Sequence, residues 1–175
     1  MSSPTAAPIS ITPVLVRVAH PEEYEAIGNL VADVYRDEGF VHGAYLDVLR
    51  DAAGRAAAAE LLVAIAPDGQ LAGTITYAAG GTPFADVAGP DEAEFRMLAV
   101  APAARGHGVG ERLVQACITR ARGQGRERLV ISTQAEMQRA HRLYERLGFV
   151  RAPERDWSPE PSVQLRVYRL DLDDA

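Results

Sequence analysis

Three glycines within five positions separate a strand-like run from a helix-like run in the stretch VAPAARGHGVGERLV, residues 100–114. Glycine has no Cβ, so its backbone N–H group can approach a ligand closely and adopt conformations that other residues avoid. A helix that begins directly after such a loop points its free N–H groups and the positive end of its dipole toward the same place. The pattern favours an anion-binding loop, and a plain glycine-rich turn is the alternative.

Two common nucleotide-binding fingerprints do not fit this loop. A dinucleotide-binding fingerprint would need a third glycine where Glu111 stands. A phosphate-binding P-loop would need a lysine, and all 18 basic residues of this chain are arginine. A site for NAD or ATP built on either fingerprint is therefore excluded.

Hydrophobic periodicity predicts a mixed sheet with helices. Apolar residues at alternate positions predict strands, and those three or four apart predict helices. The expected elements are a strand at 14–18, helices at 21–34 and 43–59, two strands around the turn at 67–69, a strand at 94–100, a helix at 109–121, a strand at 128–133, a helix at 136–147 and a strand at 163–172. This order predicts an α/β (α+β) fold.

Finer signals add local detail. Residues 80–92 have the composition of a loop, and Gly148 is placed to end a helix in the left-handed conformation. The apolar positions of the last strand change from odd to even numbers, which predicts a bulge near Val167.

Length and composition indicate one globular domain. The chain has 175 residues, and its sequence contains no interdomain linker and no run near the roughly 18 apolar residues of a membrane span. The segment MSSPTAAPIS lacks the features of a secretory signal. We expect a flexible leader at 1–8, a single domain at 9–175 and a cytoplasmic location without membrane partners. The single cysteine, Cys117, agrees with a reducing compartment.

Charge is distributed unevenly along the chain. Residues 1–95 contain 14 acidic residues and 4 arginines, whereas residues 96–175 contain 10 acidic residues and 14 arginines. The overall charge of −6 argues against a nucleic-acid partner. The basic C-terminal half instead predicts an anionic ligand.

Two sequence motifs of this chain together resemble those of the GNAT superfamily of N-acetyltransferases. One is Arg-x-x-Gly-x-Gly at residues 105–110, after a strand that ends in Leu-Ala-Val, and the other is Tyr-x-x-x-Gly-Phe at residues 144–149. The resemblance extends over the chain in element order and is most specific at residues 92–113 and 136–151. It implies the GNAT fold, a mixed, largely antiparallel twisted sheet of about six to seven strands flanked by about four helices.

The resemblance also implies acetyl-CoA as the cosubstrate. In this superfamily the loop amides hold the pyrophosphate, and the strand before the loop pairs with the pantetheine arm. The residues expected to bind phosphates are Arg105, Gly106, His107, Gly108, Val109 and Gly110, and those expected to offer main-chain bonds to pantetheine are Leu98, Ala99 and Val100.

Acyl transfer to an amine requires two proton transfers. A lysine-like amine has a pKa of about 10.4 and must lose a proton before it attacks a thioester. The resemblance places the base at Glu94, with Glu92 or a water relay as alternatives. It places Tyr144 as the acid that protonates the leaving thiolate, although Tyr144 also lies on an apolar helix face where it could only pack. We expect direct transfer in a ternary complex, because Cys117 lies in an apolar stripe and reads as a buried structural thiol.

Other candidate side chains give weaker signals. The histidines show no ligand spacing, so no metal site is expected, and His141 reads as a solvated helix residue. Many family members carry asparagine where this chain has Met137, so Gln138 is a candidate replacement. Trp157 could line an acceptor pocket or cap the core.

The acceptor is expected to be a primary amine of a small molecule or peptide. In the superfamily, segments corresponding to residues 22–58 and 79–91 shape its site. Their acidic side chains favour a cationic amine. These are Glu22, Glu23, Glu25, Asp33, Asp37, Glu38, Asp47, Asp51, Asp86 and Asp91. A non-catalytic acyl-CoA-binding regulatory module is the alternative to an enzyme. A homodimer that pairs through the C-terminal strand is expected only by analogy with similar proteins.

Overall fold

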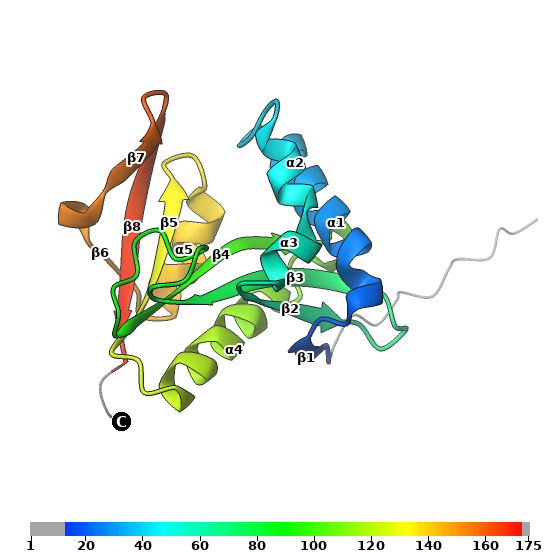
Figure 1. The fold of residues 1–175 in the computed structure, drawn as a ribbon. Coiled ribbons are helices and arrows are strands. Elements are labelled where there is room, and N and C mark those ends of the chain that lie inside the picture. The colour runs from blue at the N-terminus through cyan, green and yellow to red at the C-terminus, as the bar shows by residue number, and fades with distance from the viewer. Residues whose placement is uncertain (1–12, 173–175) are drawn as a thin grey trace, which may run out of the picture.

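A computed structural model describes residues 13–172, which form eight strands and five α-helices (Figure 1). The expected leader at 1–8 lies outside the described residues. The strands are β1 (Leu15–Val18), β2 (Glu60–Ile65), β3 (Leu71–Ala79), β4 (Glu92–Val100), β5 (Arg128–Gln134), β6 (Val150–Arg151), β7 (Trp157–Glu160) and β8 (Val163–Asp171). The helices are α1 (Tyr24–Asp37), α2 (Tyr45–Arg50), α3 (Ala52–Ala56), α4 (Val109–Gly123) and α5 (Gln138–Arg146).

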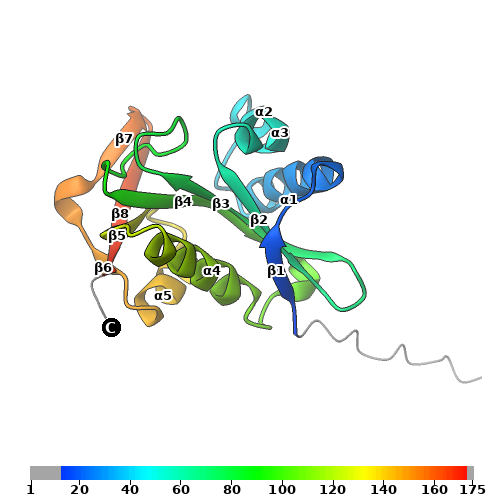
Figure 2. The same ribbon diagram turned by 60° about the horizontal axis from the view of Figure 1, so that its bottom comes forward.

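One sheet carries all these strands, in the order β1-β2-β3-β4-β5-β8-β6, with β7 also paired to β8. Every neighbouring pair is antiparallel except β4 and β5. Figure 2 shows α1, α2 and α3 on one face of the sheet and α4 and α5 on the other. The predicted mixed, largely antiparallel α/β fold is confirmed.

The sheet opens between β4 and β5. Their parallel ladder consists of three residue pairs, from Glu92 with Arg128 to Glu94 with Val130. Beyond it, β5 and β8 run steeply across the direction of β2, β3 and β4 (Figure 1). Residues 95–100 of β4 therefore have no strand partner on this side within the described chain, and their peptide groups face the gap.

A bulge in β4 accompanies the opening. Thr76 pairs with Arg96 and Thr74 with Ala99, so β4 contains one residue more than β3 between these pairs. Met97 occupies this position with a backbone φ of 55°, a conformation that residues other than glycine rarely adopt. The bulge turns Leu98 and Val100 toward the α4 side and leaves Met97 and Ala99 packed on the α1 side.

Two local predictions are wrong. The helix expected over 43–59 is two short helices, because Asp51 leaves helical geometry and its carboxylate accepts the Gly54 amide at 2.8 Å, which caps α3. The bulge expected near Val167 is absent, since β5 and β8 pair in one register from Arg128 with Asp171 to Gln134 with Leu165. Val167 and Tyr168 are both buried because both faces of β8 are covered there.

Candidate active site

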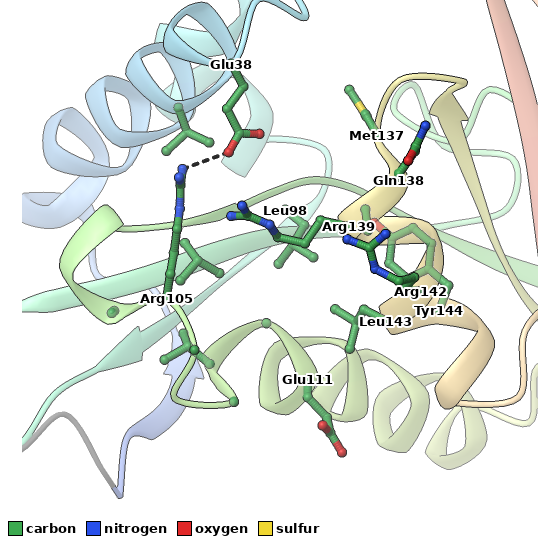
Figure 3. Close-up of a pocket in the computed structure, with 18 of the residues that line it drawn as sticks. Glu38, Leu98, Arg105, Glu111, Met137, Gln138, Arg139, Arg142, Leu143 and Tyr144 are labelled. Carbon is green, nitrogen blue, oxygen red and sulfur yellow. Dashed lines mark ion pairs between the residues drawn. The ribbon is translucent and has the colours of Figure 1, made fainter.

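A cavity of about 830 Å³ lies where the sheet opens. Its walls come from β4, from the loop and first turn of α4, from α5 and from the C-terminal end of α1 (Figure 3). Seven of the nine residues expected to bind acetyl-CoA line it: Leu98, Val100, Arg105, Gly106, Gly108, Val109 and Gly110. The glycine loop and the open edge of β4 thus share one cavity.

The loop has the geometry of an anion cradle. Gly106 and Gly108 adopt positive φ values of 77° and 75°, and α4 begins directly afterwards at Val109. The N–H groups at the start of a helix have no partner within it, so those of residues 108–111 remain free to bind a ligand. A Cβ on Gly110 would lie 3.4–3.9 Å from side chains of Leu143, Val100 and Leu98 and would fill part of the cavity. The residues present fit a bound phosphate group.

Two of the nine expected residues do not line the cavity. Ala99 is buried against α1 on the other face of β4. His107 is exposed, and its Nδ1 lies 2.9 Å from the carbonyl oxygen of Arg105. Neither side chain contributes to the cavity lining.

Tyr144 lies at the wall of the cavity and is 3% exposed. Its ring packs edge-on against Phe95, with centroids 5.5 Å apart. Its hydroxyl is the polar group that this residue can offer to the cavity it lines. Burial, and next the neighbouring Tyr35, raises the pKa of Tyr144, which keeps the phenol protonated.

Glu94 lies on β4 outside the cavity lining and is 2% exposed. Its Oε2 accepts hydrogen bonds from the amides of Val87 and Ala88, at 2.9 and 3.1 Å, and Oε1 takes no part in them. Burial raises the pKa of Glu94, against the effect of these two amides. The structure thus places Tyr144 in the cavity and Glu94 farther along the same strand that forms its wall.

Glu92 is held in a network of ion pairs. Arg155 donates to both of its carboxylate oxygens at 2.7 and 3.0 Å, Arg128 lies at 3.3 Å, and the Gly89 amide donates at 2.9 Å. Burial would raise the pKa of Glu92, but the bonds from Arg155 and Gly89 outweigh it and lower the pKa. A carboxylate with both oxygens bound in this way is a poor proton acceptor.

Residues 20–149, which contain the loop, the open strand and Tyr144, match the Acetyltransferase (GNAT) family. The chain belongs to this family. No curated protein sequence matches it significantly.

Solved GNAT structures share the fold at low sequence identity. An acetyltransferase from Staphylococcus aureus Mu50 has a TM-score of 0.74 and 15% identity, over 91% of this chain and 99% of that one. The yncA structure from Salmonella typhimurium, which contains its cofactor acetyl-CoA, has a TM-score of 0.66 and 20% identity, over 94% and 96%. Ribosomal-protein-alanine N-acetyltransferase from Brucella melitensis has a TM-score of 0.64 and 21% identity, over 90% and 99%.

Two further walls of the GNAT cavity come from α1 and α5. The end of α1 and the residues after it contribute Val34, Tyr35, Glu38 and Phe40, all within the segment 22–58 that was expected to shape the acceptor site. Sequence reasoning missed the wall from α5, where Arg139, Arg142 and Arg146 are spaced three and four residues apart and line the cavity. In Figure 3 the guanidinium groups of Arg139 and Arg142 project over it from α5. The helical spacing of these arginines was a signal in the sequence.

An ion pair joins two walls of the cavity. Arg105, at the start of the glycine loop, lies 2.9 Å from Glu38 at the end of α1 (Figure 3). Both side chains are about one-third exposed. An anion that reaches the loop must compete with Glu38 for Arg105.

We therefore expect the Glu38→Gln variant to bind acetyl-CoA about two- to fivefold more tightly than the original protein. The substitution frees Arg105, and a partly exposed ion pair contributes up to about 1 kcal/mol. Calorimetric titration at low and high salt measures the change, which salt should reduce. Glu136→Gln is the matched control, since it removes a negative charge from the same cavity lining without freeing Arg105. Equal tightening in both variants would mean that charge alone, and not the ion pair, sets the affinity.

Of the remaining candidates, Met137 and Gln138 line the cavity, whereas Trp157 and Cys117 do not. The sulfur of Met137 accepts the Thr133 hydroxyl at 3.3 Å. Trp157 donates from Nε1 to the Ser132 hydroxyl at 2.9 Å. Cys117 is fully buried, and burial raises the pKa of its thiol.

His141 is not solvated as expected. It is 8% exposed, its Nε2 lies 3.2 Å from the Thr133 hydroxyl, and its ring centroid lies 5.2 Å from that of Tyr168. Residues 13–172 contain no group of three metal-binding side chains. None of the helices described here is long and apolar enough to cross a membrane.

Proposed function

We propose that this GNAT protein transfers an acetyl group from acetyl-CoA to a primary amine of a small molecule or peptide. The observation that carries the proposal is the meeting of three features in one cavity: the glycine loop at the start of α4, the open edge of β4 and the Tyr144 hydroxyl. The acetyl-CoA bound in the yncA structure, which has the same fold, supports this choice of acyl donor.

The chain supplies the groups that such a donor needs. The free N–H groups of residues 108–111 suit a pyrophosphate, and Arg105 adds a positive charge beside them. The peptide groups of β4 beyond Glu94 suit the amides of a pantetheine arm, in the manner of an added strand. Gln138 lines the cavity near the position of the missing family asparagine and is our candidate for a further polar contact.

The proposed chemistry is direct transfer. The amine nitrogen forms a bond to the thioester carbonyl carbon, and the bond from that carbon to sulfur breaks. Glu94 accepts the amine proton through Oε1, directly or through a water molecule, and Tyr144 donates its proton to the departing thiolate. The products are an amide and the free thiol of CoA, and solvent exchange returns both side chains to their starting states.

Ligand-induced stabilisation tests the binding step. Acetyl-CoA at about 100 times its Kd should raise the free energy of unfolding by about 2.7 kcal/mol, which corresponds to an increase of about 5–10 °C in Tm for a domain of this size. Free CoA should also stabilise the protein, whereas ATP and NADH should not. Stabilisation by ATP or NADH alone would contradict the proposal, and release of CoA with an amine present distinguishes an enzyme from a binding module.

A further inference from the structure

The loop between β3 and β4 is anchored by arginines that lie far from it in the sequence. Arg126, just before β5, donates to the carbonyl oxygen of Pro90 at 2.9 Å. Arg155, in the 3₁₀ turn after β6, donates from Nη2 to the carbonyl oxygen of Val87 at 2.7 Å. Residues 80–91 contain no helix or strand. The positions of their peptide groups therefore depend on side-chain hydrogen bonds of this kind.

A second contact fixes Arg155 itself. Its guanidinium binds Glu92 through both terminal nitrogens, from Nη1 to Oε1 at 3.0 Å and from Nη2 to Oε2 at 2.7 Å. A pair with two such bonds sets the plane of the guanidinium as well as its distance. The side chain of Glu92 is 8% exposed and that of Arg155 is 24% exposed, so water competes little for the pair. Arg155 thus presents its donor to Val87 in a fixed direction.

One peptide group connects Arg155 with Glu94. The carbonyl oxygen of Val87 and the N–H group of Ala88 belong to the same peptide. The carbonyl oxygen accepts the bond from Arg155, and the N–H group donates to Oε2 of Glu94 at 3.1 Å. Hydrogen bonds in such a chain polarise and strengthen one another. Arg155 therefore acts on the Glu94 carboxylate without touching it.

The other neighbours of Glu94 give its carboxylate little support. The positions paired with it on β3 and β5 are Ala78 and Val130, which carry no charge. Arg96 lowers the pKa of Glu94 and Asp86 raises it, and these two side chains form an ion pair with each other at 2.7 Å. Glu94 is 2% exposed, so water contributes little as well. The amides of the loop before β4 are thus the main hydrogen-bond donors to this carboxylate.

We infer that Arg155 is a positioning residue for Glu94: by fixing the peptide between Val87 and Ala88 it holds Oε2 in place and leaves Oε1 to accept the proton of the amine. The inference rests on the proposed function, in which Glu94 is the base. Arg155 does not line the cavity and acts only through the loop. It also favours the charged, proton-accepting form of Glu94, because a hydrogen bond to the charged form stabilises that form.

A double variant isolates the contribution of Arg155. Arg155→Met alone would leave the buried Glu92 carboxylate without its main partner, which strongly destabilises a fold. Arg155→Met combined with Glu92→Gln removes both charges, so the net charge near Glu94 stays the same and no buried charge is left unpaired. Glu92→Gln alone breaks the same ion pair but keeps the bond from Arg155 to Val87.

The expected result is a shift of the pH profile. In the double variant the acidic limb of kcat/KM should move to higher pH by about half a unit to one unit, the range given by the loss of one hydrogen-bond contribution. The maximal kcat should fall by up to about a hundredfold, because a base that is displaced slightly reacts poorly. The Kd for acetyl-CoA should stay unchanged, since Arg155 and Glu92 do not line the cavity.

Two controls share parts of this change. Arg126→Met removes another arginine from the same loop, but its bond to Pro90 does not lead to the peptide that binds Glu94, so the limb should keep its position. Glu92→Gln removes a negative charge near Glu94, so its limb should stay or move to lower pH. A limb that moves to higher pH in these controls as far as in the double variant overturns the inference.

A carbon NMR titration of the Glu94 carboxyl group gives the same pKa without turnover. The signal is assigned by its loss in Glu94→Gln, and the pKa should rise in the double variant by the same half to one unit that we expect for the limb, or about that much. If both the titration and the limb stay in place, Arg155 stabilises the fold only and the inference is wrong. Thermal stabilisation by acetyl-CoA, measured on each variant, confirms that it folds.

The failure of the inference and that of the proposed function are distinguishable. An acidic limb that disappears in Glu94→Gln but does not move in the double variant contradicts only the role of Arg155. A limb that persists in Glu94→Gln contradicts Glu94 as the base and the inference with it. No CoA release with any amine, despite stabilisation by acetyl-CoA, contradicts the proposed transfer itself.

Discussion

Replacing Tyr144 with phenylalanine is expected to lower kcat by about a hundredfold or more and to leave the Kd for acetyl-CoA unchanged. The substitution removes only the hydroxyl of a residue that lines the cavity, and this hydroxyl donates the proton to the departing thiolate in the proposed reaction. The ring of Tyr144 packs on Phe95 at 5.5 Å, and phenylalanine keeps this contact, so stability should change little. The loss therefore reports on chemistry and not on folding.

Steady-state CoA release and calorimetric binding of acetyl-CoA separate the two quantities. Tyr168→Phe is the matched control, because Tyr168 lies in the same aromatic cluster, 6.2 Å from Tyr144, and does not line the cavity. Its hydroxyl donates to Glu145 at 3.4 Å instead. If Tyr144→Phe turns over as fast as the original protein, Tyr144 only packs, and the general acid is water or another group. A protein that binds acetyl-CoA with no turnover in any form would be the regulatory module.

The features that sequence predicted well are those built from neighbouring residues. The glycine loop and the helix after it depend on backbone properties that glycine itself sets, and α4 begins at Val109 as expected. The apolar stripe of α4 is buried as expected, with Cys117 inside it. The turn at Gly69 has the expected positive φ of 85°.

The parts that sequence did not predict depend on tertiary contacts. The β4 bulge at Met97 follows no strong local signal, because it is methionine and not glycine that adopts the positive φ. Its consequence is large, since the alternation of faces restarts there and Leu98 and Val100 reach the cavity while Ala99 does not. The ion pairs of Glu92 with Arg155 join residues 63 positions apart, so no local pattern could distinguish Glu92 from Glu94.

Replacing Glu94 with glutamine is expected to lower kcat by about a hundredfold at neutral pH, the low end of the effect of a positioned general base. Glutamine keeps an oxygen that can accept the amides of Val87 and Ala88, so the loop before β4 should retain its place. Exposed Glu127→Gln is the control for a change of charge alone. What the variant loses is the ability to take a proton.

The pH profile of the reaction makes the assignment sharper. A general base works in its deprotonated form, so activity falls as pH drops through the pKa of Glu94. Burial raises this pKa above the ordinary value of 4.5, and the fall should therefore begin at a higher pH than for an exposed glutamate. In Glu94→Gln this acidic limb of kcat/KM should disappear, leaving only the limb set by the amine of the acceptor. If this limb persists unchanged in Glu94→Gln, Glu94 is not the base. Glu92 would be a poor replacement, because both of its carboxylate oxygens accept hydrogen bonds from Arg155 and would have to lose them before taking a proton.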